Sequence, residues 1–116
     1  MAEHEWVKEF PVVAVVSDTS GIIIEMNDKA AEWFADKGGR ELLGKSLFDY
    51  HLEPSQSKIK ELLETRGANV YTIERDGAMR LIYQSPWYRN GTLAGLVQLV
   101  LQVPSAIPHH FRAPSE

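Results

Sequence analysis

Few side chains in this 116-residue sequence have the type and spacing that chemistry requires. The chain contains no cysteine, which excludes a disulfide, a thiolate metal site, a cysteine nucleophile and cysteinyl photochemistry. His109 and His110 are adjacent, and neighbours in an extended segment point to opposite sides, so no metal site is predicted there. The carboxylates of Asp18, Asp49 and Glu53 have no His or Ser partner at a recognisable catalytic spacing. An enzyme is therefore not expected.

Composition and charge are those of a globular protein, and the length allows one domain with a single core. The net charge is −4 with His neutral, and no run of Lys and Arg is present, so nucleic acid is not an expected partner. The first residues lack an apolar segment, and the longest apolar runs are too short to cross a bilayer. We expect a cytoplasmic domain with no membrane contact.

The stretch from Asn69 to Val103 predicts three antiparallel strands joined by two tight turns. Strands are predicted at Asn69–Arg75, 79–88 and 93–103, with Asp76-Gly77 and Asn90-Gly91 between them. A type I′ turn needs positive φ at both central residues, so these dipeptides are strong hairpin signals, and Gly77 and Gly91 are predicted to be structural.

Both faces of this meander carry apolar side chains. In the last strand Leu93, Val97, Leu99 and Leu101 form one alternating set, whereas Leu96 and Val100 alternate with Gln98 and Gln102 in the other. A sheet with one solvated face would alternate cleanly between apolar and polar residues. Helices are expected to cover one face, and a partner or a terminal segment the other.

The N-terminal half predicts two strands, at residues 12–16 and 22–26, followed by a helix at residues 28–36. Asn27 lies between the second strand and this helix. Its amide can cap the helix and hold the crossing loop, so we predict a structural role for it.

Two further helices are expected, at residues 3–10 and at 53–66. The first is short and carries Trp6 and Phe10 on one side, so it must dock elsewhere. We predict an N-terminal cap helix over residues 1–11, a domain over 12–103 and a proline-rich tail or linker over 104–116. The order of elements indicates an α+β domain with short helices on one face of a five-stranded antiparallel sheet.

With these elements in order, the chain resembles PAS domains, a family of sensory modules. The resemblance rests on residues 13–27, Ala30-Ala31, Phe34, residues 43–47 and Gly95, and it covers about Pro11 to Val103. It implies the sheet order 2-1-5-4-3, with a cavity between the sheet and the helices that holds haem, flavin, a small metabolite or nothing.

The facing of the last three strands also comes from this resemblance, by comparison with flavin-binding members. It implies ligand contacts from Phe34, Val70, Thr72, Ile82, Gln84, Val97 and Leu99. Thr72 and Gln84 would be the orienting polar groups of the cavity. The outer face would form a dimer interface from Trp6, Phe10, Tyr71, Leu81, Tyr83, Leu96 and Val100.

Two departures from the family limit what the resemblance implies. The family's haem-binding histidines usually lie in the long helix, whereas His51 precedes Pro54 in a predicted loop, so haem is not expected. The sheet ends in Gln102-Val103-Pro104, and proline disfavours the signalling helix that usually follows. The ligand is not identified by any motif.

Three functions remain open at this stage. The first is a sensory module in signal transduction that binds a small ligand, dimerises, and acts on an effector outside this chain. The second is a pure interaction module, a homodimer whose cavity is filled by its own side chains. The third is a small α+β enzyme such as an isomerase or cyclase, which would need a buried acid–base pair that the sequence does not reveal.

Overall fold

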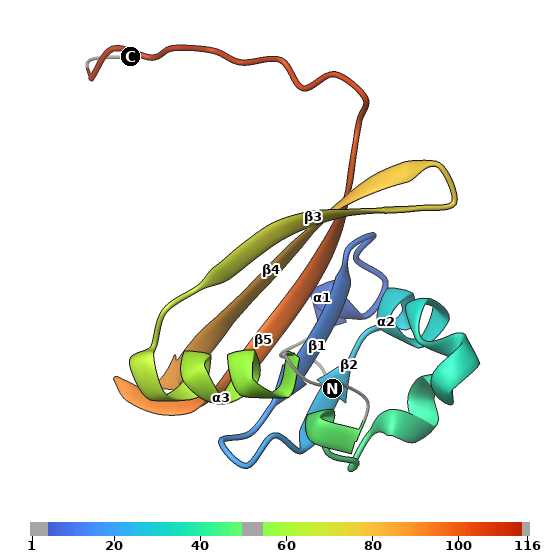
Figure 1. Ribbon diagram of the computed structural model, residues 1–116, viewed down its shortest axis with the longest axis vertical. Helices are drawn as coiled ribbons and strands as arrows, with labels where there is room; N and C mark the ends of the chain where they lie inside the picture. The colour runs from blue at the N-terminus through green and yellow to red at the C-terminus, as the bar shows by residue number, and fades with distance from the viewer. Residues whose placement is uncertain (1–4, 50–54, 115–116) are drawn as a thin grey trace.

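The computed structural model describes residues 5–49 and 55–114 of the chain. Its centre is a five-stranded antiparallel sheet in the order β2-β1-β5-β4-β3, which confirms the predicted order (Figure 1). The strands are β1 (Val13–Ser17), β2 (Ile23–Met26), β3 (Asn69–Arg75), β4 (Ala78–Arg89) and β5 (Thr92–Val103).

Two tight turns join β3 to β4 and β4 to β5. Asp76 and Gly77 have φ values of 53° and 74°, and Asn90 and Gly91 have φ values of 51° and 80°. Positive φ at both central residues defines a turn whose twist matches that of the flanking strands. The three strands therefore form one continuous meander.

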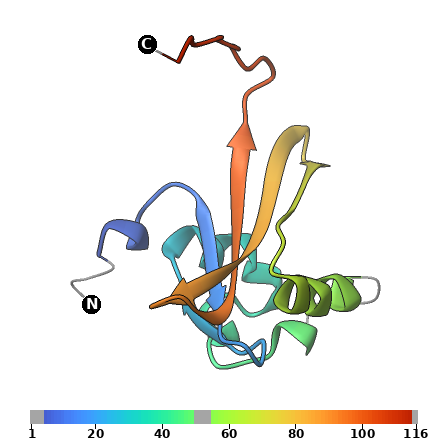
Figure 2. The ribbon, with the colours of Figure 1, turned by 90° about the vertical axis from the view of Figure 1, so that its left-hand side faces the viewer.

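The helices and 3-10 turns that follow β2 cover one face of the sheet, which we call the inner face (Figures 1 and 2). The α-helices are α1 (Glu5–Lys8), α2 (Asp28–Trp33) and α3 (Ser55–Thr65), with 3-10 turns at Ala35–Lys37, Gly39–Leu42 and Leu47–Asp49. The predicted helix over residues 28–36 is shorter because Phe34 leaves the helical conformation, with φ −103° and ψ 22°. The predicted start of the third helix, at residues 53 and 54, lies outside the described residues.

The hydrophobic core lies between these helices and the inner face. Ile59 and Leu62 of α3 and Leu42 of the second 3-10 turn are each 2% exposed. They pack with Val13 and Val15 of β1 in a single buried cluster. The apolar face of each short helix therefore covers the inner face of the sheet and buries the core.

A bulge near the second turn decides which side chains of β5 face the core. The pairing between β4 and β5 shifts by one residue between Trp87 and Tyr88. A two-residue turn without this bulge would pair Ile82 with Leu99, whereas the structure pairs Ile82 with Val100. Because paired residues of an antiparallel ladder share a face, Val100 lies with Ile82 on the inner face.

The facing taken from the resemblance is therefore wrong for seven residues. The structure places Val70, Thr72, Val97 and Leu99 on the outer face, and Tyr71, Leu96 and Val100 on the inner face. A shift of one residue in pairing moves every side chain of a strand to the other face. In β3 the two-residue turn pairs Tyr71 with Ile82, which places Val70 and Thr72 outside.

The two ends of the described chain lie apart from the core. In Figure 2, α1 and α3 are on opposite sides of the molecule. Residues 104–114 contain no helix or strand and run away from the end of β5 (Figure 1). Ile107 and Phe111 of this tail are exposed.

Candidate functional site

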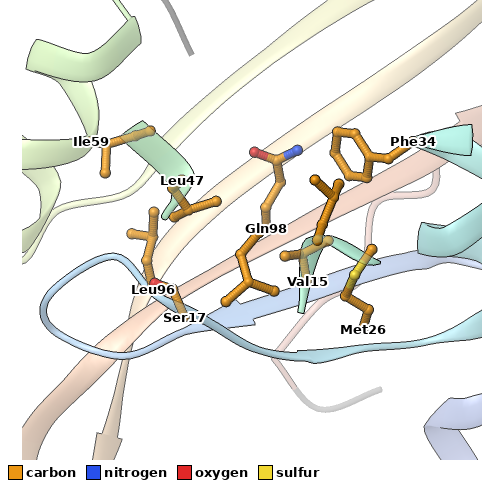
Figure 3. A pocket seen from close by; sticks show the side chains of 10 residues that line it. Val15, Ser17, Met26, Phe34, Leu47, Ile59, Leu96 and Gln98 are labelled. Carbon is orange, nitrogen blue, oxygen red and sulfur yellow. The ribbon is translucent and has the colours of Figure 1, made fainter. Parts of the chain in front are cut away.

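A small cavity lies between the inner face of the sheet and the helices (Figure 3). Its volume is about 20 Å³, which is room for about one water molecule. Its lining comes from both sheet and helices and consists of Val15, Ser17, Ile23, Met26, Phe34, Leu42, Leu47, Ile59, Leu96 and Gln98. The cavity is therefore almost filled by apolar side chains of the chain itself.

A row of amides crosses the inner face next to this cavity. Asn69 Nδ2 donates to Gln84 Oε1 at 2.9 Å, and Gln84 Nε2 donates to Gln98 Oε1 at 2.8 Å. The row links β3, β4 and β5, and the buried Gln84 has a partner on each side. Gln98 ends the row, and its amide lies close to Phe34 in the cavity (Figure 3). Among the described residues that line the cavity, Gln98 is thus the one amide that could orient a polar group there.

Only some of the predicted ligand residues lie near the cavity. Phe34 lines the cavity, and Ile82 and Gln84 lie on the inner face without lining it. The other four predicted ligand residues lie on the outer face and cannot reach the cavity: Val70, Thr72, Val97 and Leu99. Leu96 and Gln98, which do line it, were missed because both alternating sets of β5 are apolar. Hydrophobicity does not decide which of the two sets faces the core, so no signal in the sequence marked Gln98.

Asn27 makes a buried network at the crossing between β2 and α2. Its Oδ1 accepts from the backbone N–H of Ala30 at 3.0 Å and of Ala14 at 3.1 Å. Its Nδ2 donates to the backbone carbonyls of Val12 at 2.7 Å and of Val7 at 3.1 Å. One side chain therefore caps α2, holds β1 and binds the segment that carries α1.

The predicted interface residues fall into two groups. Leu81 and Tyr83 lie on the outer face, whereas Leu96 and Val100 are buried in the core. Tyr71 is on the inner face but at the sheet edge, where partial burial raises the pKa of its hydroxyl.

The two N-terminal interface residues are exposed. Trp6 and Phe10 pack edge to face with ring centroids 5.7 Å apart, and Trp6 is 70% exposed. This aromatic pair is available for further contact.

The described residues contain neither a metal-binding cluster nor a membrane-spanning helix. Over 5–49 and 55–114, no group of three or more His, Cys, Asp or Glu side chains could hold a metal ion. His51, considered as a haem ligand, lies outside the described residues. No helix in the described part of the chain is long and apolar enough to span a bilayer.

The sheet order, the helices over one face and the small cavity between them define an α+β domain of the PAS type. The family model for the PAS fold matches residues 5–92, and the chain belongs to this family. Among curated proteins no sequence matches the chain.

Solved structures with this fold include several sensory proteins. The VqmA dimer of Vibrio cholerae is 14% identical, with a TM-score of 0.66 over 89% of this chain and 51% of VqmA. The chain thus spans about half of that protein. The PAS domain of nitrogen regulation protein NR(II) from Vibrio parahaemolyticus is 15% identical, with a TM-score of 0.61 over 89% of this chain and 99% of that domain.

A haem-binding relative shares the fold as well. The Aer2 receptor of Vibrio cholerae, described as a dual PAS-heme oxygen sensor, is 12% identical. Its TM-score is 0.59 over 80% of this chain and 95% of the Aer2 chain. Identities this low show a common fold and leave the ligand of this chain undetermined.

Proposed function

We propose that this chain is a regulatory PAS module of signal transduction that acts as a homodimer, joined through the outer face of its sheet. The observation that carries the proposal is the composition of that face. Its apolar residues form the outer patch, which consists of Val16, Val70, Met79, Leu81, Tyr83, Val97, Leu99 and Leu101.

The outer patch is open to solvent in the single chain. Val70 is 51% exposed and Tyr83 is 39% exposed, and Leu81, Val97 and Leu99 are partly exposed. A contiguous apolar patch on a sheet face is typical of a protein–protein interface. A twofold axis buries the same patch on both protomers, and the exposed Trp6 and Phe10 extend it. VqmA of Vibrio cholerae, which shares this fold, is itself described as a dimer.

The nearly filled cavity favours interaction over ligand binding as the main role. A pocket for a drug-sized ligand usually measures at least about 300 Å³. Binding of such a ligand here would require the elements that line the cavity to move apart. The interface, by contrast, needs no rearrangement of the core.

Leu99→Glu tests the dimer, because Leu99 lies on the outer face between Ala14 and Tyr83. We expect the wild-type chain to sediment as a dimer at micromolar concentration. Burial of an unpaired carboxylate in the interface should weaken association on the order of 100-fold, so Leu99→Glu should be monomeric. The matched control is Leu43→Glu, at an exposed leucine outside the sheet, which should remain dimeric. A monomeric wild type would contradict the proposal.

A second candidate function is a sensor for a small ligand in the central cavity, and Gln98 favours it. An amide that faces an otherwise apolar cavity can orient a small polar group. If this role holds, native mass spectrometry and absorbance spectra of purified protein should reveal a bound molecule, and Gln98→Leu should remove it. Protein that carries no added mass under native conditions would favour the interaction role alone.

A further inference from the structure

A second pocket lies apart from the central cavity, and the two share no lining residue. It is an open pocket of about 270 Å³ between α2, the starts of β1 and β4, and the end of β5. Its lining residues are Pro11, Val13, Lys29, Glu32, Trp33, Arg80, Val100 and Gln102. This pocket is therefore a site separate from the central cavity.

The floor of this pocket contains an unsatisfied cationic group. Arg80 lies on the inner face of β4, opposite Gln102 of β5. Its Nη1 is buried and has no hydrogen-bond partner among the residues that the structure describes. A buried guanidinium N–H without an acceptor loses its hydration and gains nothing in return. Because Arg80 lines the pocket, a rotation of its guanidinium toward the pocket would let an anion there supply the missing acceptor.

The charge around the pocket is positive, although the chain as a whole carries −4. The guanidinium carbons of Arg75 and Arg80 lie 4.0 and 5.5 Å from the ring centroid of Trp33. Lys29 is on the rim and contacts Glu32 at 3.6 Å, but both side chains are largely exposed and such a pair is weak. Two cations, Arg80 and Lys29, and one carboxylate, Glu32, thus line the pocket, and Arg75 lies on the ring of Trp33.

The remaining walls are apolar and come from Pro11, Val13, Trp33 and Val100. A planar guanidinium matches a carboxylate because it can donate two parallel hydrogen bonds. A fully hydrated phosphate would leave these apolar walls unused. We propose that this pocket binds a small organic carboxylate, with the carboxylate on Arg80 and the apolar part against Trp33 and Val100.

Benzoate is a suitable probe, with neutral benzamide and inorganic phosphate as comparisons. The readout is the indole N–H resonance of Trp33 in a ¹H–¹⁵N NMR titration of the full chain, assigned with Trp33→Phe. Benzoate should shift this resonance in a saturable way. Benzamide and phosphate should bind at least roughly tenfold more weakly, because one lacks the charge and the other lacks the apolar part.

Two variants separate the pocket from general charge effects. Arg80→Gln should weaken benzoate binding by roughly tenfold or more. Arg89→Gln is the matched control, since Arg89 lies 5.2 Å from the Trp87 ring and outside this pocket, and it should leave binding unchanged. If Arg80→Gln does not fold, Lys29→Gln on the exposed rim should still weaken binding by about two- to fivefold.

The proposal is overturned if benzoate gives no saturable shift at Trp33. It is also overturned if benzamide or phosphate binds as tightly as benzoate, because the carboxylate or the apolar walls would then play no part. Equal effects of Arg80→Gln and Arg89→Gln would equally overturn it, since binding would then follow net charge and not this pocket.

Discussion

Gly95→Ala is expected to destabilise the domain far more than the same substitution at Gly77. A Cβ atom at Gly95 would lie 1.8 Å from the backbone oxygen of Ser17 and 2.7 Å from its carbonyl carbon. The same carbonyl accepts a hydrogen bond from Trp87 Nε1 at 2.9 Å, so it is held in place from a second side. The φ of Gly95 is 153°, a conformation that other residues rarely adopt.

Relief of this overlap requires β1 and β5 to separate at their pairing. We expect a loss of at least about 3–4 kcal/mol in the free energy of unfolding, and a fall in melting temperature of more than about 10 °C. Thermal and urea unfolding followed by circular dichroism would measure it. Gly77→Ala is the control, because its Cβ meets nothing within 4 Å and only its φ of 74° opposes the change. Equal losses for the two variants would contradict the close approach at Gly95.

Asn27→Ala should have the second largest effect on stability. It would remove acceptors from the N–H groups of Ala14 and Ala30, both of them buried residues, and a donor from the carbonyl of Val12. Each buried group left without a partner costs about 1–3 kcal/mol, so a total loss of roughly 3–5 kcal/mol is expected.

Asn27→Ser separates the two tasks of this amide. A serine hydroxyl can cap α2 but is too short to reach the carbonyls of Val7 and Val12 as well. Its loss in unfolding free energy should therefore lie between those of wild type and Asn27→Ala. Amide hydrogen exchange should show faster exchange in residues 5–12 for both variants. If Asn27→Ala costs less than about 1 kcal/mol, the network does not hold these segments together.

The local elements of this fold could be predicted because short-range chemistry decides them. Asp76-Gly77 and Asn90-Gly91 can adopt the positive φ values that place both turns of the meander. Asn27 lies between a strand and a helix, where an amide has backbone groups to bind. Such signals need no knowledge of the rest of the molecule.

The facing of the strands could not be predicted in the same way. Both alternating sets of β5 are apolar, so hydrophobicity gives no preference, and the bulge at Trp87 and Tyr88 leaves no clear pattern in the sequence. As a result the wrong side chains were assigned to the cavity, and Gln98 was missed. The contact of Arg75 and Arg80 with Trp33 joins residues more than forty positions apart along the chain, and no local pattern reports it.

The alternating facing of β5 also limits how this gene segment can change. A substitution in β5 alters one side chain, but loss of a single codon beyond the bulge, between Leu96 and Val103, would move every side chain that follows it to the other face of the sheet. Loss of Gln98, for example, would turn Leu99 and Leu101 to the helices and Val100 to solvent. The strand can therefore vary its composition through many generations while its length between Gly95 and Val103 is held constant.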